Sequence, residues 1–201
     1  MRSIVLASTS PYRRELLQRL RLPFLVDAPQ IDESALPGEA PRATALRLAQ
    51  AKARAVATRH IDAIVIGSDQ VADLDGSALS KPGSHARALA QLESLQGRTV
   101  VFHTALAVLD VRSGALASEV DDTEVEFRSL PRSSLDAYLR VDRPYDCAGA
   151  ARIESLGIAL VERIATVDPT ALIGLPLIRL VSMLAKHGVT VPTANASDPV
   201  A

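Results

Sequence analysis

The chain has 201 residues, of which 48% are hydrophobic and 22% are charged, and its formal net charge is −1. This balance is typical of a soluble globular protein and gives no overall attraction to nucleic acid or to an anionic membrane. The single cysteine, Cys147, excludes an intramolecular disulfide and agrees with a reducing compartment. No stretch approaches the roughly 18 consecutive apolar residues of a membrane span. We therefore expect a cytoplasmic protein with neither a nucleic-acid nor a membrane partner.

Strand and helix patterns alternate along the chain, beginning with an apolar strand directly before a helix that Ser10 caps. The predicted helices cover residues 10–21, 42–59, 84–95, 132–142 and 175–187. The predicted strands cover residues 3–7, 24–27, 62–69, 99–111, 117–127 and 157–164, with a hairpin at 71–79. Because hairpins and βαβ patterns both occur, we expect an α/β fold with a mixed sheet. Residues 1–188 are predicted to form a single domain and residues 189–201 a disordered tail.

The common phosphate and metal motifs are absent from the sequence. It contains no G-x-x-x-x-G-K-[ST], no G-x-G-x-x-G, no H-E-x-x-H and no G-x-S-x-G. These absences disfavour a P-loop NTPase, a dinucleotide enzyme, a zinc hydrolase and an α/β-hydrolase.

The stretch "LASTSPYRRELL" places three hydroxyl residues and two arginines at the start of a helix. Cations are disfavoured there by the helix dipole, whereas free N–H groups and hydroxyls favour an anion. A bound phosphate would offset the position of Arg13 and Arg14 through charge-assisted hydrogen bonds. The alternative is a plain cap at Ser10 with both arginines in solvent, and these residues alone do not decide between the two.

Lys52 lies in the middle of the apolar stripe of the second predicted helix. The other members of this stripe are Ala45, Leu48, Ala49, Ala53 and Val56. A lysine on this face needs either a route to water or a buried anionic partner, and the first is the commoner arrangement.

Asp69 ends the apolar strand in "IVIGSDQ", at the edge where open α/β sheets place their sites. It could hold a divalent cation or orient a water, or it could simply cap a turn. Glu33 in "IDES" is a possible second metal ligand, and Lys81 in "LSKPG" is a further loop cation. Together with the helix start, these residues predict a Mg²⁺-dependent phosphate or nucleotide site.

Eight separated segments resemble, in order, those of the Maf family of nucleoside triphosphate pyrophosphatases. They are "LASTSPYRRELL", "IDES", "RLAQAKA", "GSDQV", "KP", "LQGRTVVFHTALAV", "YDCAGAARIESLGIALVERI" and "GLPLIRL". The resemblance implies a Maf/inosine triphosphatase-like fold, a mixed twisted β-sheet flanked by helices with a cleft between two lobes. It also implies cleavage of a nucleotide between its α- and β-phosphates. "STSPYRR", "GSDQV" and "CAGAARIESLGI" are similar to the branch that hydrolyses 7-methyl-GTP.

The resemblance assigns roles to individual side chains. Asp69 matches the catalytic position that activates water, and Glu33 with Asp69 would share a Mg²⁺ or Mn²⁺ ion. Ser8, Arg13, Lys52 and Lys81 match phosphate-binding positions, and Tyr12, Gln70 and Glu154 match positions that select the base.

The chemistry of guanine is consistent with base selection by Tyr12 and Glu154. The carboxylate of Glu154 can accept hydrogen bonds from the N–H donors of guanine, and Tyr12 could stack on a cationic methylated ring. Asp146, which is more typical of the wider family, leaves a dTTP/UTP pyrophosphatase as an alternative. A nucleotide-binding regulator of septum formation is an alternative of another class. The family also suggests a homodimer.

Overall fold

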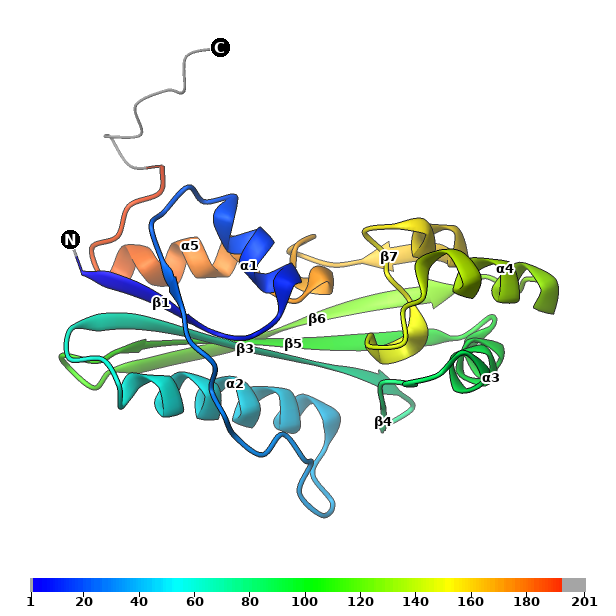
Figure 1. Cartoon of the computed structure of the whole chain (residues 1–201), viewed down its shortest axis with the longest axis horizontal. Helices are drawn as coiled ribbons and strands as arrows, with labels where there is room; N and C mark the ends of the chain where they lie inside the picture. The colour runs from blue at the N-terminus through cyan, green and yellow to red at the C-terminus, as the bar shows by residue number, and fades with distance from the viewer. Residues whose placement is uncertain (1, 193–201) are drawn as a thin grey trace, which may run out of the picture.

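The computed structural model describes residues 2–192, which form a seven-stranded mixed sheet with helices on both faces (Figure 1). The strand order is β2-β1-β3-β5-β6-β7, and β4 pairs with β3. The strands are β1 (Ser3–Ala7), β2 (Leu25–Val26), β3 (Ala63–Leu74), β4 (Ser77–Leu79), β5 (Thr99–Asp110), β6 (Leu116–Phe127) and β7 (Val161–Ala165). This arrangement confirms the predicted α/β class with a mixed sheet.

The helices follow the sequence patterns closely, with shorter ends. They are α1 (Pro11–Gln18), α2 (Pro41–Ala57), α3 (His85–Leu95), α4 (Arg132–Asp142) and α5 (Leu177–Lys186). Ser10 caps α1 as predicted, accepting from the backbone N–H of Arg13 at 3.4 Å. Helix α5 begins only after Pro176, whose ring favours the first turn of a helix over its interior.

Strand β3 is longer than the sequence indicated. The predicted strand 62–69 and the first arm of the hairpin 71–79 form one continuous strand, so Asp69 does not lie at a strand end. Parallel pairing with β1 stops at Gly67, whereas antiparallel pairing with β5 continues to Asp73. Asp69 therefore lies just beyond the carboxyl end of the parallel part, where β1 has turned away into α1.

The alternation of side chains along β1 distributes two cores over the two faces of the sheet. Ile4 and Leu6 pack with α1 and α5 on one face, and Val5 and Ala7 pack with α2 on the other. Gly67 of β3 allows α2 to approach the sheet closely. A Cβ at this position would lie only 2.2 Å from the carbonyl oxygen of Ala49 in α2. This contact brings the middle of α2 against β3 beside Asp69.

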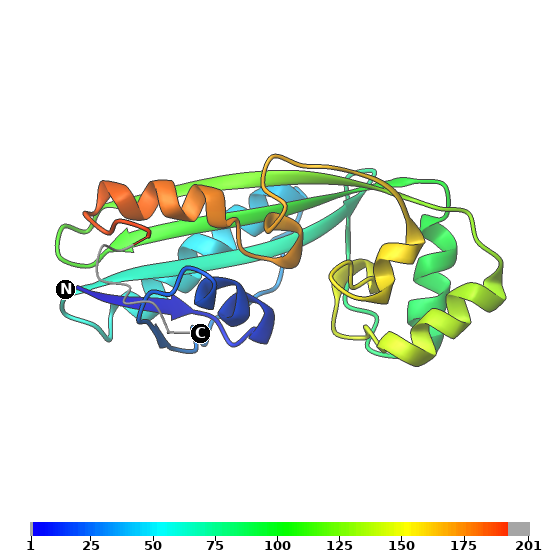
Figure 2. The same ribbon diagram turned by 90° about the horizontal axis from the view of Figure 1, so that it is seen from above.

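A third core lies at the other end of the sheet, where α3 and α4 pack together (Figure 2). The chain there differs from the predictions, because residues 157–160 of the expected strand belong to the 3-10 turn Leu156–Leu160 and β7 starts at Val161. A shorter 3-10 turn, Ala148–Ala150, interrupts the expected loop. The loop from Asp146 to Glu154 thus belongs to this end of the molecule.

Within residues 2–192, no helix is both long and apolar enough to cross a membrane. Most of the tail expected to be disordered, residues 193–201, lies outside the described residues. The partition into a single domain with a tail stays a prediction.

Candidate functional site

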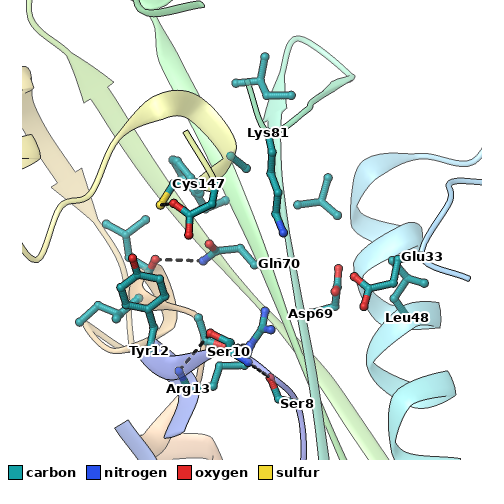
Figure 3. Close-up of a pocket in the computed structure, with 18 of the residues that line it drawn as sticks. Ser8, Ser10, Tyr12, Arg13, Glu33, Leu48, Asp69, Gln70, Lys81 and Cys147 are labelled. Carbon is teal, nitrogen blue, oxygen red and sulfur yellow. Dashed lines mark hydrogen bonds between the residues drawn. The ribbon is translucent and has the colours of Figure 1, made fainter. Parts of the chain in front are cut away.

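A cavity of about 630 Å³ opens between the two ends of the molecule. One wall comes from the turn after β1 and from α1, α2 and β3, and the facing wall comes from the loops after β4 and before β7. Nine of the predicted site residues line it: Ser8, Tyr12, Arg13, Glu33, Lys52, Asp69, Gln70, Lys81 and Glu154. The predicted cleft between two lobes is therefore present, and the predicted residues meet in it (Figure 3).

The start of α1 forms one side of the cavity. The buried Ser8 hydroxyl accepts from the backbone N–H of Ser10 at 3.1 Å, which tightens the turn before the helix. Arg13 donates from Nε to the carbonyl of Gly174 at 2.8 Å. Its two terminal nitrogens have no protein partner among the described residues, so they are free to bind an anion in a fork geometry. Arg14, in contrast, is exposed and does not line the cavity.

Burial lowers the pKa of Arg13 from its ordinary value, while the nearby carboxylates of Asp69 and Glu33 act in the opposite direction. Arginine nevertheless stays protonated in proteins, because its guanidinium delocalises the charge. Arg13 therefore supplies a partly desolvated positive charge to the cavity.

Lys52 has a buried anionic partner. Its side chain is only 5% exposed, and its Nζ donates to Asp69 Oδ1 at 2.6 Å and lies 3.0 Å from Glu33 Oε1. Of the two explanations for a lysine on the apolar stripe of α2, the buried partner is correct and the route to water is wrong. Asp69 Oδ2 accepts from none of the described residues and is available to a water or a ligand.

The loop that carries Glu33 is tied to α2. Arg47 donates to the carbonyl of Ser34 at 2.9 Å and to both carboxylate oxygens of Glu39 at 2.7 Å each. These contacts hold the loop against α2, and Glu33 lies beside Asp69 (Figure 3). On the opposite wall, the exposed Lys81 extends its amine toward the same two carboxylates.

Gln70 has a fixed amide orientation. Its Nε2 donates to Thr104 Oγ1 at 2.8 Å and lies 3.0 Å and 3.1 Å from the carbonyls of Ala171 and Leu172. Three acceptors around one nitrogen define which end of the amide is which. The side-chain oxygen, which accepts from no described residue, is left as a hydrogen-bond acceptor for a ligand.

Tyr12 and Glu154 lie at the end of the cavity formed by the loop before β7. Burial raises the pKa of Tyr12 to about 12, so its hydroxyl stays protonated and can donate at neutral pH. Arg152 lies over the Tyr12 ring, with Cζ 5.3 Å from the ring centroid, and its Nε is 3.7 Å from Glu154 Oε1. This end of the cavity therefore combines an aromatic ring with a carboxylate.

The carboxylates fit a magnesium-type ion that takes part of its coordination from a ligand. Glu33 and Asp69 converge on one cation, the Lys52 amine, at 3.0 Å and 2.6 Å. No group of three or more His, Cys, Asp or Glu side chains with metal-binding geometry occurs in residues 2–192. Two carboxylates that rely on phosphate oxygens and waters for the remaining ligands are typical of Mg²⁺ sites.

The turn between β7 and α5 supports several of these side chains, although the sequence patterns do not predict it as part of the site. Its carbonyls accept from Arg13, Gln70 and Ser68, the last at 2.9 Å through Gly174. Main-chain carbonyls carry no sequence signature. The motif "GLPLIRL" begins at Gly174, whose φ of 118° favours glycine, so this residue is a local signal of the turn.

The fold and the cavity define an α/β protein with a charged pocket beside a mixed sheet, lined by three cations and two carboxylates: Arg13, Lys52, Lys81, Glu33 and Asp69. The chain belongs to the Maf family, since it matches the family "Maf-like protein" over residues 3–187.

Several proteins are similar to this chain over nearly its whole length. A 7-methyl-GTP pyrophosphatase from Cupriavidus metallidurans is 57% identical over 92% of this chain and 94% of its own length. Proteins of the same name from Ralstonia nicotianae and Thiobacillus denitrificans are 60% and 58% identical, covering 90% and 97% of this chain and 93% and 97% of their own lengths. The Ham1 protein of Staphylococcus aureus is 16% identical, with a TM-score of 0.44 over 62% of this chain and 71% of that one.

Proposed function

We propose that this protein is a nucleotide pyrophosphatase that hydrolyses 7-methyl-GTP to 7-methyl-GMP and pyrophosphate. The observation that carries the proposal is the division of the cavity into a charged end and an acceptor end. Arg13, Lys52 and Lys81 gather with Glu33 and Asp69, whereas Gln70 and Glu154 offer acceptor oxygens near Tyr12. The names of the close relatives support the same substrate.

The charged end is suited to a triphosphate, whose transfer reactions depend on positioning and charge stabilisation. Arg13 and Lys81 are free to contact phosphate oxygens, and Ser8 presents a hydroxyl beside Arg13. Asp69 Oδ2 accepts a proton from the attacking water while the oxygen of that water bonds to the α-phosphorus. The bond from the α-phosphorus to the bridging oxygen then breaks, and pyrophosphate leaves. A Mg²⁺ or Mn²⁺ ion held by Glu33 and Asp69 would supply further charge stabilisation.

The acceptor end favours guanine over a pyrimidine. Guanine presents N1–H and N2–H₂ donors, which match the Glu154 carboxylate and the free oxygen of Gln70. Uracil and thymine present one N–H between two carbonyls, and those carbonyls would face acceptors instead of donors. The positive charge of a 7-methylated ring favours both the carboxylate and the Tyr12 ring.

The decisive test is pyrophosphate release from 7-methyl-GTP, GTP, dTTP and UTP with Mg²⁺ or Mn²⁺, with Asp69→Asn and Glu154→Gln beside the wild type. We expect kcat for 7-methyl-GTP to fall by at least about 100-fold in D69N, the usual cost of losing a general base. E154Q should lower the ratio of kcat/KM for 7-methyl-GTP to that for UTP by about tenfold or more.

Each alternative has its own result in the same assay. Preference of the wild type for dTTP or UTP would support the dTTP/UTP pyrophosphatase and refute the argument from Glu154 and Gln70. Nucleotide binding without hydrolysis of any substrate would support a regulator of septum formation. A cytoplasmic location and a homodimer remain predictions that fractionation and sedimentation can test.

A further inference from the structure

Arg152 connects the two side chains at the base end of the cavity. Its guanidinium lies over the Tyr12 ring, 5.3 Å from the centroid, and its Nε is 3.7 Å from Glu154 Oε1. Tyr12 comes from α1 and Glu154 from the loop before β7, so the two belong to opposite walls of the cavity. Tyr12 and Glu154 both line the cavity, whereas Arg152 does not. Arg152 therefore touches the residues of the base end without being part of the cavity surface.

The backbone of Arg152 is held in place by its own loop. Its N–H donates to the buried Tyr138 hydroxyl at 2.9 Å, and its carbonyl accepts from the backbone N–H of Ser155 at 3.1 Å. Gly157 packs directly against it, since a Cβ at that position would lie 2.3 Å from the Arg152 carbonyl oxygen. The guanidinium thus extends from a fixed point toward Tyr12 and Glu154.

The side chain of Arg152 makes few polar contacts with the rest of the described chain. Its Nε is buried and has no hydrogen-bond partner among residues 2–192, and its Nη1 reaches the carbonyl of Asp142 only at 3.5 Å. Glu154, in turn, has no other charged or hydrogen-bonding contact within the described part of the chain. Burying an arginine nitrogen without a hydrogen-bond partner costs free energy. The contacts of the guanidinium with the Tyr12 ring and the Glu154 carboxylate are therefore its main compensation.

We propose that Arg152 is a positioning residue for base recognition, which orients the Tyr12 ring and the Glu154 carboxylate relative to each other. A planar guanidinium can stack on an aromatic ring and pair with a carboxylate at once, which lysine does less well. The inference rests on the proposed function, because it assigns to Arg152 an effect on the base and none on the phosphates.

The test compares Arg152→Met and Arg152→Lys with the wild type. We expect R152M to raise KM for 7-methyl-GTP by about three- to tenfold, with kcat changed less than about twofold, because a partly exposed ion pair and a cation–π contact are lost while Asp69 is untouched. R152K should recover part of this loss. Arg163→Met is the matched control, since Arg163 pairs with Glu126 at 3.3 Å away from the cavity, and it should leave KM unchanged.

Two inhibitors separate positioning from a general structural defect. In R152M, the inhibition constant of 7-methylguanosine, which has only the base and sugar, should rise in parallel with KM. That of inorganic tripolyphosphate, which probes the charged end alone, should stay within about twofold. The inference is overturned if R152M has an unchanged or lower KM for 7-methyl-GTP, or an unchanged inhibition constant for 7-methylguanosine. It is also overturned if the inhibition constants of both inhibitors rise equally. A wild type inactive on 7-methyl-GTP would overturn the proposed function and this inference with it.

Discussion

Lys52 pairs its single amine with two carboxylates of the cavity, those of Glu33 and Asp69. Asp69 and Lys52 have side chains only 9% and 5% exposed, while Glu33 is half exposed at 52%. Removing one member of a buried pair leaves the other charge without compensation, which costs more than the pair contributes. Lys52 therefore affects the stability of the fold as well as the charge of the cavity.

We expect Lys52→Met to lower the free energy of unfolding by about 3 kcal/mol, because Asp69 stays buried without its cation. Urea unfolding of the protein without nucleotide measures this loss. Arg54→Met on the exposed face of the same helix is the control and should change stability by less than about 0.5 kcal/mol. Equal stability of the two variants would contradict the assignment of Lys52 to a buried pair.

At the scale of elements, the turn before α5 is built around the buried carboxylate of Asp168. Its Oδ1 accepts from the backbone N–H and the hydroxyl of Thr170 at 2.9 Å and 2.6 Å, and its Oδ2 accepts from the N–H of Ile178 at 2.7 Å. These bonds shape the turn whose carbonyls contact Arg13 and Gln70. Asp168 does not line the cavity, so it acts on the site through this turn.

Asp168→Ala should lower the free energy of unfolding by about 3 kcal/mol, because several buried donors lose their acceptor. It should also raise KM for the nucleotide, since Arg13 and Gln70 lose the carbonyls that position them. Asp168→Asn keeps an acceptor oxygen and should lie between wild type and D168A in both measurements. A wild-type KM in a folded D168A protein would show that the turn does not position the site.

For the whole molecule, acid sensitivity follows from carboxylates that pair with arginines, both within one segment and between distant ones. Hydrogen bonds from Arg47 lower the pKa of Glu39 to about 2 from its ordinary value of 4.5. Hydrogen bonds from Arg2 likewise hold the pKa of Asp110 below its ordinary value, linking the start of β1 to the end of β5. A depressed pKa stabilises the folded state above the ordinary pKa, and this contribution is lost as the pH falls.

We therefore expect Tm to be steady from about pH 7 to 5 and to fall below about pH 4.5. Arg47→Met should lower Tm at pH 7 but make the decline between pH 4.5 and 2 shallower, because Glu39 then titrates nearer its ordinary pKa in the folded state. Calorimetric scans across this range measure both slopes. An R47M curve parallel to that of the wild type would contradict the role of Glu39.

The sequence alone determined most elements, and it singled out nine of the residues that line the cavity. Periodicity identified the five helices and placed Lys52 on the buried face of α2, because these signals depend on neighbouring residues only. The family motifs located Ser8, Arg13, Asp69 and Lys81, and the structure brings them to one cavity. The roles given to these residues stay predictions for the assays above.

Only the tertiary structure decided contacts between distant segments. The continuation of β3 past Asp69 depends on its pairing with β5, which a strand pattern cannot show. The direction of the Gln70 amide depends on carbonyls about a hundred residues away, and the contact of Arg152 with Tyr12 joins residues about 140 positions apart. Sequence patterns report local conformation and burial, whereas the orientation of a side chain is chosen by partners that folding brings beside it.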